Sequence, residues 1–307
     1  MLKCIYIYLL ASILTVSSNL LMGQSNFKMD TSSKPSFKIQ IDYLNNYIYN
    51  GRADSIASPY QITTASANFG NGFYANLIAN YLLTPNQRRF DFFELDLGYE
   101  YKLGTKMSGE LYASKYFYSN QSSLLNGDIT SDFGATFNYD LGFFQFNNTA
   151  DIFFSGKSDF QIMPGVEKSF EFGEENSKWD FTPGIYSVMS SLNYYESVLT
   201  RNLNRQKGIK NTLPVSGNIQ SATTVLDKGF KLLAIECSIP ISYQADKWGF
   251  QFTPTLAIPF HPIKTLTTNS VTLPSGAVNS NTIDSTPYSE KNLSNLFYFQ
   301  IGLNYKF

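Results

Sequence analysis

The sequence contains very little cysteine and histidine. Its 307 residues include two cysteines, Cys4 and Cys237, and one histidine, His261. Cys4 lies in an N-terminal segment that we expect to be removed, so the mature chain can form neither an intramolecular disulfide nor a cysteine-cluster metal site. Phosphate-binding glycine loops and the HExxH and GxSxG patterns are also missing in a fitting context. No motif therefore points to a metal centre, a cofactor or a nucleophilic enzyme.

Charge is scarce as well, and so are long apolar runs. Charged residues make up 15% of the chain and the formal net charge is -1, so nothing attracts the chain as a whole to nucleic acid. A helix that spans a bilayer needs about 20 apolar residues, and no stretch beyond the N-terminus approaches this length. If the exported chain lies in a membrane, we therefore expect a closed barrel.

The N-terminal segment has the form of a secretory signal peptide. Lys3 supplies the positive charge, an apolar stretch runs from about Cys4 to Val16, and a polar break precedes Gly23. The apolar stretch is too short for a membrane anchor. We predict cleavage after Gly23, which gives a signal peptide over 1–23, a short periplasmic segment over 24–35 and a β-domain over 36–307.

Aromatic residues are abundant, with 26 Phe and 21 Tyr, and they recur at every second position. Such residues favour strands, in which successive side chains point to opposite faces. From residue 36 onward, twelve segments of about ten residues show this alternation. The last of them, FYFQIGLNYKF, places six apolar or aromatic side chains on one face: Phe297, Phe299, Ile301, Leu303, Tyr305 and Phe307.

The connections between these segments alternate in length. Short turns are expected at 70–71, 103–106, 140–142, 173–178 and 244–247, and longer loops at 49–59, 83–89, 119–128, 155–159, 191–229 and 261–292. An even number of strands, with both termini on the short-turn side, is typical of outer-membrane barrels. Pro183, Pro240 and Pro254 fall inside predicted strands, so we expect bulges or gaps in the hydrogen-bond ladder there.

The closing segment, with its alternating aromatics and terminal Phe307, resembles the C-terminal strand of bacterial outer-membrane β-barrel proteins. The signal peptide, the strands and the loop asymmetry extend the resemblance over essentially the whole chain. It implies an all-β, transmembrane antiparallel barrel in the outer membrane, in contact with lipid and lipopolysaccharide. It also implies that the barrel-assembly machinery recognises the last strand, with Tyr305 and Phe307 as the assembly signal. The resemblance identifies an architecture and not a subfamily.

The inward face of such a barrel would be rich in acid, while most of the arginines fall in the loops. Walls that carry carboxylates concentrate cations and repel anions. Twelve strands also enclose more space than the eight whose side chains can fill an interior. We predict a cation-favouring wall whose selectivity residues are Asp42, Glu94, Asp96, Glu100, Asp132, Asp151 and Glu167, with Lys115 as a possible inward base.

The resulting prediction is a porin-like channel for passive diffusion of small, preferably cationic or neutral solutes, with no nucleic-acid partner. The solute and the oligomeric state are left open. One alternative is a lipid-modifying enzyme that uses His261, although residue 263 is Ile rather than Ser and prolines flank the histidine. The other is a closed barrel that binds a partner through loops 191–229 and 261–292, the first of which has an amphipathic stretch in SVLTRNLNRQKGIK.

Overall fold

The protein is described here by a computed structural model. It describes residues 34–53, 57–122, 124, 126–174, 177–193, 195, 218–226, 228–272 and 277–307. The predicted signal peptide, its cleavage site and almost all of the 24–35 segment lie outside these residues, as does the amphipathic stretch of loop 191–229. Among the residues described, no helix is both long and apolar enough to cross a membrane.

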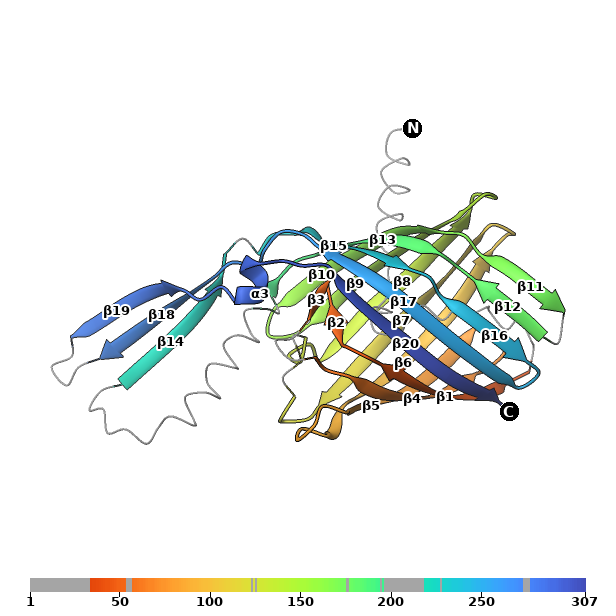
Figure 1. The fold of residues 1–307 in the computed structure, drawn as a ribbon, viewed down its shortest axis with the longest axis horizontal. Coiled ribbons are helices and arrows are strands. Elements are labelled where there is room, and N and C mark those ends of the chain that lie inside the picture. The colour runs from red at the N-terminus through yellow and green to blue at the C-terminus, as the bar shows by residue number, and fades with distance from the viewer. Residues whose placement is uncertain are drawn as a thin grey trace.

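The chain forms a closed antiparallel β-barrel of twelve strands, as Figure 1 shows. Nine strands are continuous, and three are each interrupted once. In chain order they are β1 (Ser36–Leu44), β4 (Tyr60–Asn68), β5 (Phe73–Leu82), β6 (Arg89–Leu103), β7 (Met107–Tyr118), β8 (Ser131–Asp140), β9 (Gln145–Phe154), β10 with β11 (Ser158–Glu167 and Phe170–Glu174), β12 with β13 (Ser177–Phe181 and Gly184–Ser190), β15 with β16 (Lys231–Ser238 and Ile241–Ala245), β17 (Trp248–Pro259) and β20 (Leu296–Lys306).

The last strand closes the barrel. β20 pairs with β1 on one side, where Ile39 lies opposite Tyr305, and with β17 on the other, where Trp248 lies opposite Tyr305. Each remaining strand pairs with its neighbour in the chain, so no crossover is needed. The predicted all-β barrel is confirmed, and the predicted strand over 107–118 coincides with β7.

Two of the three predicted strand prolines, Pro183 and Pro240, lie at interruptions, and Pro254 lies in the continuous strand β17 opposite the interruption between β15 and β16. The interruptions fall at residues 168–169, 182–183 and 239–240. Backbone hydrogen bonds still cross them, because the carbonyls of Pro183, Pro240 and Pro254 accept from Lys168, Thr182 and Ile239. A proline has no N–H to donate. The hydrogen bonds that the prolines cannot donate are therefore missing at the same height on neighbouring strands. At each of these places the carbonyl of the proline still accepts a hydrogen bond from the adjacent strand.

The two faces of the wall differ as the alternation predicts. On β20, Phe297 and Phe307 are 62% and 63% exposed on the outer face, while Gln300 between them is buried. The outer face of β1 repeats this pattern with Phe37, Ile39 and Ile41. An apolar outer band around a closed barrel is the arrangement that lipid requires. Lys115 is exposed on this outer face beside Leu111, so its predicted inward position is wrong.

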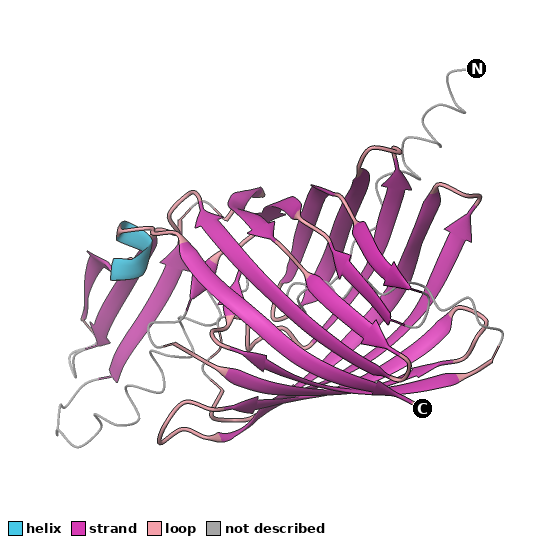
Figure 2. Cartoon of the chain, turned by 45° about the vertical axis from the view of Figure 1, so that its right-hand side comes forward, coloured by secondary structure: helices cyan, strands magenta, loops and turns pink. Residues whose placement is uncertain are grey.

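The strands end in two different kinds of connection. Both termini of the barrel and the links at 69–72, 104–106, 141–144 and 246–247 lie at one end, which we call the turn end. The links at 45–59, 83–88, 119–130, 191–230 and 260–295 lie at the other, which we call the loop end. The link between β9 and β10 is also at this end but spans only residues 155–157, so no long loop occurs at the predicted 155–159. Figure 2 shows that most of the described chain is strand, joined by turns and loops.

The two longest links at the loop end carry structure of their own, which the sequence did not predict. β14 (Asn218–Val225), β18 (Thr265–Thr272) and β19 (Val278–Asp284) form a separate three-stranded antiparallel sheet, which we call the loop sheet. It extends away from the barrel on the side opposite the C-terminus (Figure 1), and the short helix α3 (Tyr288–Lys291) follows it. The 45–59 link holds a small hairpin of β2 (Ile48–Tyr49) and β3 (Arg52–Ala53).

Candidate functional site

The predicted selectivity residues all point into the barrel. They alternate with the exposed outer residues on β1, β6, β8, β9 and β10. Their burial falls into two groups. Asp96 and Glu100 are half-buried, whereas the following five are at most 9% exposed: Asp42, Glu94, Asp132, Asp151 and Glu167.

Most of these carboxylates are held by side chains from other inward positions. Asp42 accepts two hydrogen bonds from the amide of Gln40, at 2.9 and 3.0 Å. Tyrosine hydroxyls donate to several others across strands. The pairs are Tyr112 with Asp151 (2.5 Å), Tyr116 with Asp132 (3.1 Å), Tyr186 with Glu167 (2.6 Å), Tyr74 with Glu110 (3.1 Å) and Tyr298 with Glu236 (3.3 Å).

Glycines make room for three of these tyrosines. Tyr74 lies opposite Gly98 in the register, Tyr112 opposite Gly134, and Tyr186 opposite Gly165. A Cβ on Gly98 would come within 2.3 Å of the Tyr74 ring, and one on Gly165 within 2.2 Å of the Tyr186 ring. The Tyr74 and Tyr112 hydroxyls reach a carboxylate on the strand beyond the glycine, whereas Tyr186 reaches Glu167 on β10 itself, two positions from Gly165. This Tyr-opposite-Gly pairing is a signal that sequence reasoning missed, because it needs the register.

Some inward acceptors have no donor from the described chain. Gln161 and Asp151 face each other in the register of β10 and β9, and both are fully buried. Oε1 of Gln161 and Oδ2 of Asp151 have no hydrogen-bond partner among the described residues. Two facing acceptors need donors between them, which water supplies. Since neither side chain is exposed, a water that bonds to both acceptors would be bound individually between the two strands.

An apolar cluster gathers at the loop end of the barrel. It combines inward residues of the wall with residues of the links, and we call it the mouth cluster. The links at 45–59 and 119–130 contribute Tyr47, Tyr49, Leu124 and Ile129, and the links at 191–230 and 260–295 contribute Leu192, Tyr195 and Ile263. The wall contributes Leu44, Tyr60, Ile62, Ile78, Leu82, Phe92, Tyr116, Phe153 and Leu233, and Val225 is added from the loop sheet.

One arginine binds the closing links together. Arg52 of β3 is 4% exposed, and its guanidinium donates to the carbonyls of Asn50, Leu233, Phe260 and His261 at 2.7–3.0 Å. Its Nε lies 3.2 Å from Oε1 of Glu290 in α3. The other oxygen of Glu290 accepts from the backbone N–H of Ile263 at 2.8 Å. We call this arrangement the Arg52 clasp.

Arg52 is one of the arginines that the sequence places in the loops, and no pattern in the sequence relates it to Glu290. They are 238 positions apart. Gly51 is part of the same arrangement, because its φ of +70° lets the hairpin turn and a Cβ there would lie 2.4 Å from that of Ala234. No local pattern could have identified this contact.

The histidine alternative finds little support in the geometry. His261 is exposed, has a left-handed backbone with a φ of 52°, and places Nδ1 2.8 Å from the carbonyl oxygen of Leu232. That contact joins the ring to backbone rather than to an acid that would orient it for catalysis. Within the part of the chain that is described, no cluster of three or more His, Cys, Asp or Glu side chains could hold a metal.

Comparisons with known proteins find similar folds but no relative of known function. No family model and no curated protein matches the chain. Among solved structures, a porin matches 89% of this chain and 99% of its own at 10% identity, with a TM-score of 0.28. CdiB from Acinetobacter baumannii covers 89% of this chain and 60% of its own at 10% identity and a TM-score of 0.29. An anion-selective porin from Comamonas acidovorans covers 89% and 98% at 8% identity and a TM-score of 0.24.

Similarity at this level transfers no function and no solute. The closed barrel and its apolar outer band carry the conclusion instead. The protein is a membrane-spanning β-barrel. Its outer surface accordingly meets the lipids of the membrane.

Proposed function

We propose that this protein is a porin-like channel that is closed at rest at its loop end and passes small neutral or cationic solutes when the mouth opens. The observation that carries the proposal is the contrast between a polar, acid-rich interior and the apolar mouth cluster above it. A permanently sealed shell has no use for facing acceptors such as Asp151 and Gln161, because unpaired buried polar groups are costly. A hydrated passage leaves them solvated.

The direction of the barrel follows from its ends. Short turns face the periplasm in outer-membrane barrels and longer loops face the exterior. We therefore place the loop end, with the mouth cluster and the loop sheet, at the cell surface. The preference for cations rests on the inward carboxylates, which outnumber inward bases such as Lys38 and Lys306.

The Arg52 clasp supplies the test. Glu290→Gln keeps a hydrogen-bond acceptor for Ile263 but removes the charge that balances Arg52. We expect this variant to fold and to show more frequent open steps than the wild type in a planar bilayer with a potassium chloride gradient. The increase should be about tenfold if the ion pair holds the mouth by about 1.4 kcal/mol. Heat-modifiable migration on gels checks that the barrel has formed.

Lys291→Gln is the matched control. Lys291 lies next to Glu290 in α3 but bonds to Asp284 at the surface, where both side chains are about half exposed. Its loss should leave the open probability unchanged, since exposed ion pairs contribute little. If the Glu290→Gln barrel is folded and never conducts, the proposal of a channel is wrong.

A specific observation favours a second candidate, a closed barrel that binds a partner at the cell surface. The loop sheet is an ordered element, and all seven residues of its edge strand β19 are exposed. An exposed strand edge is a template for pairing with another chain. Absence of conductance from both folded variants would favour this candidate over the channel.

A further inference from the structure

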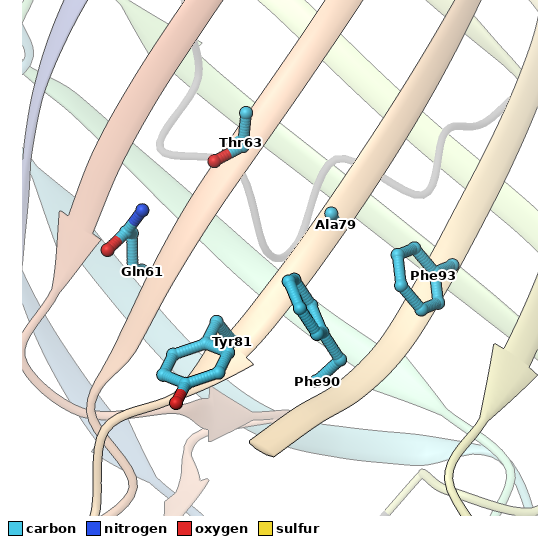
Figure 3. A pocket seen from close by; sticks show the side chains of 6 residues that line it. All are labelled: Gln61, Thr63, Ala79, Tyr81, Phe90 and Phe93. Carbon is cyan, nitrogen blue, oxygen red and sulfur yellow. The ribbon is translucent and has the colours of Figure 1, made fainter. Parts of the chain in front are cut away.

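The outer wall of the barrel carries a groove that the channel function does not use. Six outward side chains from three neighbouring strands surround it: Gln61 and Thr63 of β4, Ala79 and Tyr81 of β5, and Phe90 and Phe93 of β6 (Figure 3). Its volume is about 500 Å³. The small side chains of Thr63 and Ala79 lie opposite each other in the register, so they form the floor between larger neighbours.

A bulge in β6 shapes the aromatic side of the groove. The register shifts so that Tyr81 pairs with Phe90 and Asn80 with Phe92, which leaves Asp91 as the extra residue. Asp91 and Phe92 are both buried inside the barrel, and Phe90 and Phe93 therefore become neighbours outside it. Their rings stack with centroids 5.4 Å apart, and the Tyr81 ring meets Phe90 edge-on at 5.1 Å.

The groove lies at the rim of the loop end. Gln61 and Phe90 are each the second residue of their strands, and Tyr81 is the last residue but one of β5. At this level the hydrocarbon of a membrane gives way to headgroups. An exposed amide such as that of Gln61 is unfavourable against hydrocarbon but fits the ester or amide linkage of an acyl chain.

Positive charge lies just beyond the rim. Arg88 is exposed in the link between β5 and β6. The neighbouring Arg89 is committed to Asp91 of the bulge at 2.7 Å and to the carbonyls of Gln87 and Gln121. Arg88 is thus placed to meet an anionic headgroup above the groove, and a guanidinium bonds well to phosphate.

We propose that this rim groove binds an acyl chain of lipopolysaccharide in the outer leaflet. The aromatic rings contact the chain, Gln61 bonds to the linkage, and Arg88 faces a phosphate. The choice of this lipid rests on the proposed direction of the barrel, because the loop end must face the leaflet that holds phosphorylated glycolipid. The groove itself does not depend on whether the barrel conducts.

The test fills the groove without touching the interior. Ala79→Phe places a ring on its floor, and Ala113→Phe is the matched control, because Ala113 is exposed on the outer face of β7 opposite Leu97 and borders none of the lining residues. Both proteins are extracted from outer membranes in mild detergent and examined by native mass spectrometry. Each is then titrated with purified lipopolysaccharide and, in parallel, with phosphatidylethanolamine.

We expect the wild type and Ala113→Phe to retain lipopolysaccharide and Ala79→Phe to bind it about tenfold more weakly, since several methylene groups lose their contact. Arg88→Gln should weaken binding and reduce its dependence on salt. Equal binding by Ala79→Phe and the wild type would overturn the proposal, and so would equal loss in both alanine variants. Tighter binding of phosphatidylethanolamine would show that the lipid is wrong, whatever the conductance measurement gives.

Discussion

At the scale of single residues, the interior is organised by tyrosines rather than by opposite charges. Six inward carboxylates accept a hydrogen bond from a tyrosine hydroxyl. The ion pair Arg52–Glu290 lies in the links, Arg89–Asp91 at the loop end of β6 and Lys178–Glu171 at the turn end. A phenol supplies one donor and no charge, so the carboxylate is oriented but not neutralised. The inner wall can therefore be rigid and still attract cations.

Removal of the hydrogen bond between Tyr112 and Asp151 should lower the stability of the barrel measurably. Tyr112→Phe removes the hydroxyl that bonds to Asp151, whose side chain is fully buried. Because a buried acceptor loses its donor, we expect the free energy of unfolding to fall by about 1–3 kcal/mol. Urea titration of the refolded protein in lipid vesicles, followed by tryptophan fluorescence, measures the change.

Tyr101→Phe provides the comparison on the other face of the wall. The Tyr101 hydroxyl donates to the carbonyl of Thr136 at 2.9 Å, on the lipid side and at an uncharged acceptor. Its removal should cost only about 0.5–1.5 kcal/mol. A loss for Tyr112→Phe no larger than that for Tyr101→Phe would mean that Asp151 is well solvated without the tyrosine.

At the scale of elements, the strands were predictable because each has to present one face to lipid. The rows of apolar side chains, such as Phe37, Ile39 and Ile41, can face only the lipid. A shift of the strand register by one residue would turn them toward the polar interior. The loop sheet has no such constraint. Its strands are rich in Thr, Ser and Asn and are bordered by water, so alternation carried no signal there. The Arg52 clasp was invisible for a different reason, since its partners meet only after the barrel has closed.

The last strand makes a prediction about assembly. Phe307 is exposed on the outer face, its N–H donates to the carbonyl of Phe37, and its ring meets Tyr305, which packs on Trp248. If the assembly machinery reads this end, Phe307→Ala should lower the amount of heat-modifiable barrel in outer membranes severalfold. Its unfolding free energy after refolding in vesicles should change little, because an exposed side chain buries little area against protein.

Phe73→Ala is the control for that measurement. Phe73 is 54% exposed on the outer face of β5 and also contacts a tyrosine, Tyr99, with ring centroids 4.8 Å apart. It is far from the C-terminus in the chain. Equal loss of folded barrel in both variants would mean that the cell responds to a missing aromatic anchor in general and not to the terminal residue.

At the scale of the whole molecule, charge of the two signs is separated in space. The acidic side chains are concentrated on the inner wall, whereas Arg88 lies at the rim. The charge of Arg52 is paired with Glu290 beside the mouth cluster. An ion that enters the opened barrel passes the rim first and the wall afterwards. Which region controls selectivity depends on which has the narrower and less hydrated passage, because fields act most strongly where water is excluded.

The opened Glu290→Gln channel allows the two regions to be compared. Neutralising the wall with Asp96→Asn, Glu100→Gln and Glu167→Gln together should move its reversal potential in a potassium chloride gradient from the cation side toward zero. Arg88→Gln should leave that potential on the cation side, since an exposed charge is screened within about 8–10 Å at physiological salt. If the reversal potential is unchanged by the three wall substitutions but shifts in Arg88→Gln, the rim and not the wall controls selectivity. The inward carboxylates that accept from tyrosines would then orient those side chains, and the charge of the seven predicted selectivity residues would have no part in choosing the solute.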